Sequence, residues 1–154
     1  MTVTFRDARA RDLPAIVAML ADDGLGKGRE TPDRPEIYSL AFGRMEGDVN
    51  NRVIVAERDG RIVGCFQITF IQGLSRAGAR RALVEGVRTA AEARSQGIGE
   101  ALLRTSFQAF ARRGKGGAQL HVDSQSLTGA TRLYERVGMT AQPRFATLEK
   151  QLRP

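Results

Sequence analysis

Short stretches rich in apolar and β-branched residues, separated by polar or glycine-containing segments, recur along the chain, which is typical of β-strands. These stretches are residues 2–6, 52–57, 62–70, 82–89, 119–123 and 145–152. Asp59 and Gly60 separate the second and third stretches, and this pair predicts a tight hairpin turn. Gly86 interrupts the fourth stretch, where it predicts a bulge or a close backbone approach.

Between the strands, apolar residues recur at the three- and four-residue spacing of a helix. Asp12 is a candidate N-cap for a first helix that ends near Asp22, and Pro35 opens a second helix. A third helix begins near Gly97, and a fourth covers residues 128–137. The apolar stripes expected to be buried are Leu13, Ile16, Val17 and Leu20 in the first helix, and Ile37, Leu40, Ala41 and Met45 in the second.

The alternation of strands and helices predicts an α/β (α+β) domain. No internal repeat, linker or change of composition divides the chain, so residues 1–154 are expected to form a single domain. Residues 23–30, between the first two helices, have the glycine content of a mobile loop.

The net charge of +7 raises nucleic acid as a partner, since basic surfaces collect polyanions. The cations are nearly all arginine and are scattered along the chain, there is no Trp, and no aromatic residues interleave with the charges. A solvated charged surface is therefore the better interpretation, and a nucleic-acid partner is not expected.

Cys65 is the lone cysteine, which excludes an intrachain disulfide and a cysteine-rich zinc site, and no metal is expected. No stretch approaches the roughly 18 uncharged apolar residues of a membrane span. Residues 1–7 lack the basic and apolar segments of a signal peptide, so a cytoplasmic location is expected.

The clearest chemical signal is a segment that leads from a strand, through a loop, into a helix whose first turn reads Gln96-Gly97-Ile98-Gly99. A helix N-terminus has unpaired N–H groups and a partial positive charge, which suit phosphate groups. Gly97 and Gly99 lack Cβ atoms, so a diphosphate can approach the backbone closely. Leu102 breaks the dinucleotide fingerprint, and no Walker-type Gly-Lys-Ser/Thr follows. A glycine-rich helix start that binds nothing is the alternative.

Arg94-Ser95-Gln96-Gly97-Ile98-Gly99 resembles the signature Arg/Gln-x-x-Gly-x-Gly/Ala of the GCN5-related N-acetyltransferase (GNAT) superfamily. Downstream, residues 122–139 resemble the family's strand-loop-helix that ends in Leu-Tyr-Glu-x-x-Gly-Phe/Met. Residues 6–14 and the hairpin at residues 59–60 also fit, so the resemblance covers almost the whole chain.

This resemblance implies a mixed, strongly bent, six- to seven-stranded sheet flanked by about four helices and splayed between strands 4 and 5. Acetyl-CoA would be inserted at the splay, with its pantetheine arm on the backbone of residues 87–89 and its pyrophosphate on the N–H groups of residues 95–100. The cofactor contacts so implied are Val87, Arg88, Thr89, Arg94, Ser95, Gln96, Gly97, Ile98, Gly99, Glu100 and Ser126. Ser126 stands where the family often has Asn, which makes that contact weaker or places a hydroxyl in it.

Transfer also requires that the amine lose a proton and that the departing thiolate gain one. Tyr134 matches the family tyrosine that often protonates the thiolate; the alternative is a tyrosine ring packed in the core. Glu85 is the candidate base, because a carboxylate in an otherwise apolar strand is costly to bury without a partner or a role. Two residues before Val87, it is expected to face the cleft. One alternative is a solvent-facing or salt-bridged Glu85, which the bulge at Gly86 favours because it could change the facing of this residue. His121 as the base, or a water chain, are the others.

The resemblance implies an acetyl-CoA-dependent N-acetyltransferase that acts on a primary amine of a small molecule or peptide by direct attack in a ternary complex. The alternative is a non-catalytic acyl-CoA-binding sensor or interaction module of the same fold. Segments 22–35, 72–81 and 140–144 would choose the acceptor, and their charges of both signs leave the acceptor open. Self-association is common in this fold, and a homodimer paired through its last strands is one arrangement that it allows.

Overall fold

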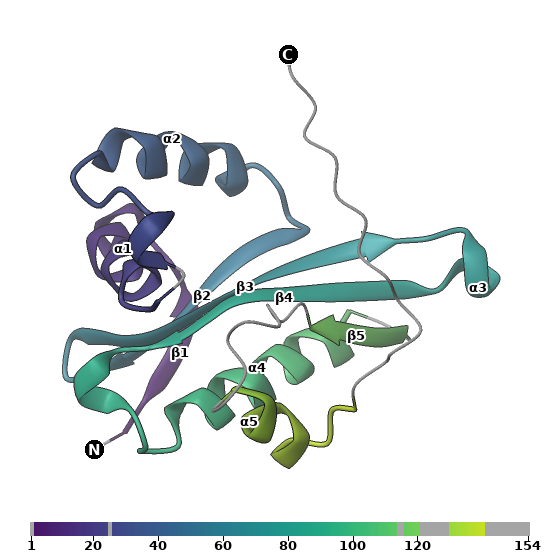
Figure 1. Cartoon of the computed structure of the whole chain (residues 1–154). Coiled ribbons are helices and arrows are strands. Elements are labelled where there is room, and N and C mark those ends of the chain that lie inside the picture. Colours follow the sequence, from purple (N-terminus) through teal and green to yellow (C-terminus); the bar gives the residue numbers. More distant parts are fainter. Residues whose placement is uncertain (1, 25, 114–115, 121–129, 141–154) are drawn as a thin grey trace.

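The computed structural model describes residues 2–24, 26–113, 116–120 and 130–140 of the chain. Within these residues, one mixed sheet has the strand order β1-β2-β3-β4-β5 (Figure 1). The strands are β1 (Thr4–Asp7), β2 (Asn51–Arg58), β3 (Arg61–Gln72), β4 (Arg80–Thr89) and β5 (Gly116–Leu120). Neighbouring strands are antiparallel except for the parallel β4–β5 pair. The α+β architecture and the mixed sheet are therefore confirmed, while the strand predicted at residues 145–152 lies outside the described residues.

Helices cover both faces of the sheet, with α1 and α2 on one side and α4 and α5 on the other (Figure 1). They are α1 (Leu13–Ala21), α2 (Pro35–Glu46), α4 (Ile98–Ala111) and α5 (Ala130–Arg136), with a single turn, α3 (Ser75–Gly78), between β3 and β4. The positions predicted for the four longer helices are confirmed to within a few residues. Within the described part of the chain, no helix has the length and apolarity that crossing a membrane requires.

The core between the sheet and α4 fixes where α4 begins. Phe70 of β3 stacks on Phe110 of α4, with ring centroids 6.5 Å apart. A Cβ at Gly64 would lie 2.8 Å from Cδ1 of Leu102, which is fully buried, so glycine lets α4 pack closely on β3. Burial of this apolar surface is the main stabilising contribution of the interface. It places the N-terminus of α4 beside the C-terminal end of β4.

The two predicted irregularities of the sheet are confirmed. Asp59 and Gly60 have φ values of 52° and 75°, as a two-residue hairpin turn of type I′ requires. In the β3–β4 pair, Gln67 lies opposite Glu85, but Cys65 lies opposite Arg88, so β4 carries one extra residue between these pairs. Gly86 (φ 58°) is in that bulge.

The bulge changes which side chains share a face of the sheet. Cys65 and Gln67 are two residues apart on β3, and directly opposed residues share a face. Their partners Arg88 and Glu85 therefore project from the same face of β4, the face covered by α1. The expectation that Glu85 shares a face with Val87 is wrong, because the extra residue shifts the alternation by one.

The apolar stripe predicted for α2 is wrong for Ile37, Leu40 and Ala41, which are exposed, and right for Met45. Ile37 and Leu40 are 42% and 60% exposed, whereas Phe42 is buried. Tyr38, Phe42 and Met45 form the face that is turned inward, at four- and three-residue spacing. The Tyr38 hydroxyl donates to Glu30 Oε2 (2.9 Å), which ties this face to the preceding loop.

Asp12 occupies the N-cap position of α1, as predicted, but its side chain caps no backbone N–H of that helix. The carboxylate instead accepts the N–H of Arg9 (2.8 Å) and two hydrogen bonds from the Arg6 guanidinium, 2.7 and 3.1 Å long. The predicted start of the helix is therefore confirmed, but the Asp12 side chain does not cap it.

Candidate active site

The loop after β4 ends in a run of open hydrogen-bond donors. Gly97 is the N-cap of α4, and the first bond of that helix runs from the N–H of Ala101 to the Gly97 carbonyl (3.1 Å). Within the described residues, no acceptor faces the backbone N–H groups of residues 95–100. Ser95 and Gly97 have positive φ values of 61° and 79°, and such alternation turns successive N–H groups toward a common point. This loop is exposed and suits an anion.

The two glycines of the signature have different roles. A Cβ at Gly97 would meet nothing within 4 Å, so the space beside it is open, and its positive φ favours glycine. A Cβ at Gly99 would lie 3.0 Å from Cδ2 of Leu133 and 3.7 Å from Oγ1 of Thr89. Gly99 therefore lets α5 pack against α4, and its predicted role in clearing a path for a diphosphate stays a prediction.

Side chains brace this loop without covering its N–H groups. Arg58, in the β2–β3 hairpin, donates to Gln96 Oε1 (2.6 Å), and Gln96 Nε2 donates to the Glu92 carbonyl (2.9 Å). Glu100 pairs with Arg104 one turn later on α4 (2.8 Å). The hairpin thus brings a cation to the loop, and the acidic side chain of the first turn is partly neutralised.

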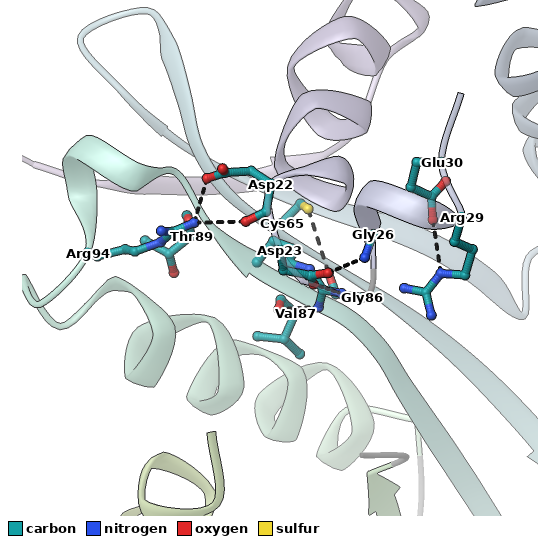
Figure 2. A network of polar contacts seen from close by, with 11 residues as sticks. Asp22, Asp23, Gly26, Arg29, Glu30, Cys65, Gly86, Val87, Thr89 and Arg94 are labelled. Atoms are coloured by element: carbon teal, nitrogen blue, oxygen red, sulfur yellow. Dashed lines mark hydrogen bonds and ion pairs between the residues drawn. The ribbon is translucent and has the colours of Figure 1, made fainter. Parts of the chain in front are cut away.

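Two arginine–aspartate pairs join the end of α1 to β4 and to the loop. Figure 2 shows Asp22 turned toward Arg94, whose Nη2 lies 2.6 Å from Asp22 Oδ2 and 3.3 Å from the Asp22 carbonyl. The Nε of Arg94 also donates to the Thr89 carbonyl (3.4 Å). Arg88 Nη2 lies 2.7 Å from Asp23 Oδ2. The Arg94 guanidinium, predicted to contact the cofactor, is thus engaged with protein groups.

Asp22 and Asp23 lie in a segment whose charges left the acceptor open, and nothing in the sequence indicates that they pair with arginines. Residues 22 and 94 are remote in the chain, and no local spacing connects them. The Asp23 carboxylate also supports the glycine-rich turn that follows it, because the Gly26 N–H donates to Asp23 Oδ1 (Figure 2).

Cys65 lies beneath the bulge of β4 and is fully buried. Its thiol donates to the Gly86 carbonyl, with the sulfur 3.7 Å from the oxygen (Figure 2). Burial raises the pKa of the Cys65 thiol from 9.0 to about 12, and the charge of Arg88 opposes this shift only in part. The thiol is therefore protonated at neutral pH and has no nucleophilic role.

The two candidate catalytic residues lie on different elements. Glu85 is partly buried and lies opposite Gln67, whose amide donates to Asn51 Oδ1 (2.9 Å) on the same face of the sheet. Tyr134 is partly buried on α5. Burial raises the pKa of Tyr134, and the positive charge of Arg88 acts in the opposite direction. Ser126 and His121, the other candidates, lie outside the described residues.

Other features of the surface do not coincide with these residues. A groove of about 510 Å³ lies between the β1–β2 edge and the C-terminal half of α4, and none of the predicted site residues lines it. Among the described residues, no three His, Cys, Asp or Glu side chains are grouped as a metal site would need. The loop at residues 95–100 is therefore the feature of the described chain that best fits a ligand.

Comparison with protein families gives one match, to the family described as "Acetyltransferase (GNAT) family", over residues 14–139. No curated protein matches the chain.

Several solved structures are similar over nearly their whole length. A transcriptional regulator from Bacillus halodurans C-125 is 39% identical, with a TM-score of 0.89, over 98% of this chain and 100% of that one. An aminoglycoside acetyltransferase from an uncultured soil metagenomic sample, in complex with sisomicin, is 18% identical, with a TM-score of 0.79, over 98% and 97%. A predicted acetyltransferase from Clostridium acetobutylicum with acetyl-CoA is 16% identical, with a TM-score of 0.73, over 96% of each chain. The last two share the fold.

Proposed function

The chain belongs to the acetyltransferase (GNAT) family, and from this we propose that it transfers the acetyl group of acetyl-CoA to a primary amine of a small molecule or peptide. The observation that carries the proposal is the run of open N–H groups at residues 95–100, directly beyond the bulged end of β4. A helix N-terminus with several free donors is a site for phosphate groups, of which CoA has a diphosphate.

The residues present fit acetyl-CoA in two respects. The space beside Gly97 is open, and Arg58 brings a positive charge to the loop. Pairing of β4 with β5 is described as far as Val84 and Leu120. As the family resemblance implies, the extended pantetheine arm would pair with the backbone of residues 87–89. The Clostridium acetobutylicum neighbour, crystallised with acetyl-CoA, supports the same cofactor here.

In this proposal, acetyl-CoA supplies an acetyl group activated as a thioester. Glu85 accepts the proton of the amine, directly or through water, from the sheet face that it shares with Arg88. Tyr134 gives a proton to the departing thiolate. A phenol keeps its proton at neutral pH and is available as the acid, and burial raises the pKa of Tyr134 further. The backbone of residues 95–100 orients the cofactor.

The class of acceptor is supported by the metagenomic neighbour, which is an aminoglycoside acetyltransferase in complex with sisomicin. A non-catalytic acyl-CoA sensor would share the donor run but would not need Glu85 or Tyr134. The Bacillus halodurans protein is called a transcriptional regulator, so binding to duplex DNA at moderate salt belongs among the control measurements.

The test is a thermal shift with acetyl-CoA, CoA and desulfo-CoA on three proteins. A ligand at 100 times its Kd stabilises the wild type by about 2.7 kcal/mol. Gly97→Glu puts a bulky carboxylate into the open space beside the N–H groups and should reduce affinity at least about tenfold. Gly97→Asn is the matched control, because asparagine tolerates the positive φ without adding charge.

Stabilisation of the wild type and of Gly97→Asn, but not of Gly97→Glu, supports the cofactor site. An amine panel with acetyl-CoA then separates enzyme from sensor, with Tyr134→Phe as the catalytic control. The absence of any shift with all three ligands would refute the proposed function.

A further inference from the structure

The two arginine–aspartate pairs at the end of α1, called the clasp below, are Asp22–Arg94 and Asp23–Arg88. Both aspartates come from the turn that leaves α1, and both arginines come from the side of the proposed cofactor. The clasp therefore joins the segment between α1 and α2 to β4 and to the loop at residues 95–100.

The position of Arg94 depends on the loop at residues 95–100. Arg94 directly precedes Ser95 in the chain, and Ser95 is the first residue of the open N–H run. The Arg94 Nε donates to the Thr89 carbonyl at the end of β4 (3.4 Å). Its Nη2 contacts both the side chain and the carbonyl of Asp22. An anion that fixes the N–H groups of residues 95–100 must also restrict the backbone that carries Arg94, and through Arg94 it restricts Asp22.

Arg88 forms the second connection at the bulge. Its Nη1 donates to the Val87 carbonyl (3.0 Å), and its Nη2 pairs with Asp23. The Asp23 carboxylate in turn accepts the Gly26 N–H, so it shapes the turn at Gly26–Gly28. A ligand along residues 87–89 would thus act on the same segment through a second path.

The exposure of the clasp suits a contact that responds to a ligand. Arg94 and Asp22 are 52% and 50% exposed, and Arg88 and Asp23 are 25% and 27% exposed. Exposed ion pairs contribute little to folding stability, so such pairs open and re-form at small cost.

We propose that the clasp couples cofactor binding to the segment at residues 22–34, so that CoA on the loop restrains this segment and the segment in turn favours CoA. Such coupling is reciprocal, because one free energy of interaction governs both sites. The inference rests on the proposed function, since it takes CoA as the ligand and residues 22–34 as a border of the acceptor site. Asp22, Asp23, Arg88 and Arg94 act as positioning residues.

The test is limited trypsin digestion with and without saturating CoA, followed by mass spectrometry of cleavage after Lys27 and Arg29, which lie inside the segment. In the wild type, CoA should slow cleavage at these sites by at least about fivefold. In Asp22→Asn with Asp23→Asn, the slowing should fall below about twofold, while the Kd for CoA, measured separately by calorimetry, weakens by no more than the lost coupling factor.

Two further variants separate a specific link from a general loosening. Asp33→Asn removes a negative charge from the same segment outside the clasp and should keep the full effect of CoA. Arg94→Gln removes the cation that Asp22 contacts, and it should reproduce the loss. Combining Arg94→Gln with Asp22→Asn should add nothing further, because both act on one contact.

The outcomes distinguish the two proposals. If CoA binds the wild type but cleavage is not slowed, or is slowed equally in the clasp variants, the coupling is refuted and the proposed function stands. If CoA does not bind the wild type at all, both are refuted.

Discussion

The helix α1 is held by arginine–aspartate contacts at both of its ends, and the two ends differ. At the N-terminal end, Arg6 makes two hydrogen bonds to Asp12 (2.7 and 3.1 Å) and one to Glu57 (2.8 Å). At the C-terminal end, the two pairs of the clasp have similar lengths, 2.6 and 2.7 Å. The chemistry is the same, but Asp12 is 5% exposed, whereas Asp22 is 50% exposed.

Burial, rather than contact length, decides what each of these ion pairs does. A desolvated carboxylate with three hydrogen bonds cannot lose its partner without leaving an uncompensated charge. A solvated carboxylate exchanges its partner for water at little cost. One end of α1 is therefore fixed to β1 and β2, and the other is available to respond to a ligand.

The largest effect is expected at the buried end. Asp12→Asn leaves the Arg6 guanidinium without its main counter-charge and should lower the free energy of unfolding by about 3 kcal/mol. Urea denaturation at neutral pH measures this. Asp7→Asn is the matched control, because Asp7 is 62% exposed in its pair with Arg52 and should lose less than about 1 kcal/mol. Equal losses for the two variants would contradict the comparison.

The same pair should respond to acid. Hydrogen bonds from the Arg6 guanidinium hold the pKa of Asp12 below its ordinary value. Because the pKa of Asp12 is lowered in the folded state, the stability that the pair with Arg6 contributes is complete above the ordinary carboxyl pKa. It is lost as the pH falls through the lowered pKa of the folded state. The stability difference between wild type and Asp12→Asn should therefore shrink below about pH 4. A constant difference down to pH 2 would be inconsistent with this pair.

The bulge beneath the clasp should respond to alkali instead. The pKa of Cys65 is raised from 9.0 to about 12, so the unfolded chain loses its thiol proton first as the pH rises. The stability that the protonated, buried thiol contributes is therefore complete below pH 9 and is lost between pH 9 and 12. By pH 10, wild type should have lost about 1.4 kcal/mol more than Cys65→Ser, which keeps a donor to the Gly86 carbonyl. Parallel profiles in denaturant titrations would contradict the buried, protonated thiol.

The smallest effect on stability is expected at the clasp itself. Asp23→Asn should lower the free energy of unfolding by less than about 1 kcal/mol, and Asp22→Asn by less still, since its pair is more exposed. Both losses should disappear in high salt, which screens exposed charges. A loss near that of Asp12→Asn would make the clasp a structural element and remove the contrast between the two ends of α1.

Structural features that depend on only a few neighbouring residues were predicted correctly. Asp59-Gly60 gave the hairpin turn, Gly86 gave the bulge, and Pro35 and Gly97 marked the starts of α2 and α4. In each case the backbone conformation follows from the residue itself, through a free or a fixed φ. The GNAT resemblance rested on the same kind of information, and the family match over residues 14–139 confirms it.

Errors arose where the outcome depended on packing. Helix α2 buries the face that contains Phe42 and exposes the face that contains Leu40, and nothing within the helix decides between the two faces. The facing of Glu85 depended on the register of β3 against β4, because one extra residue reverses the alternation.

The order and type of the elements, the position of the loop that presents N–H groups, and the family of the protein all follow from the amino-acid sequence. The pairing of Asp22 with Arg94, of Asp23 with Arg88, and of Asp12 with Arg6 rather than with a helix end follows from the three-dimensional packing. The physical reason is that backbone conformation is governed by neighbours in the chain. The partner and the burial of a charge are instead fixed by the packing of α1 against the sheet, which brings remote residues together.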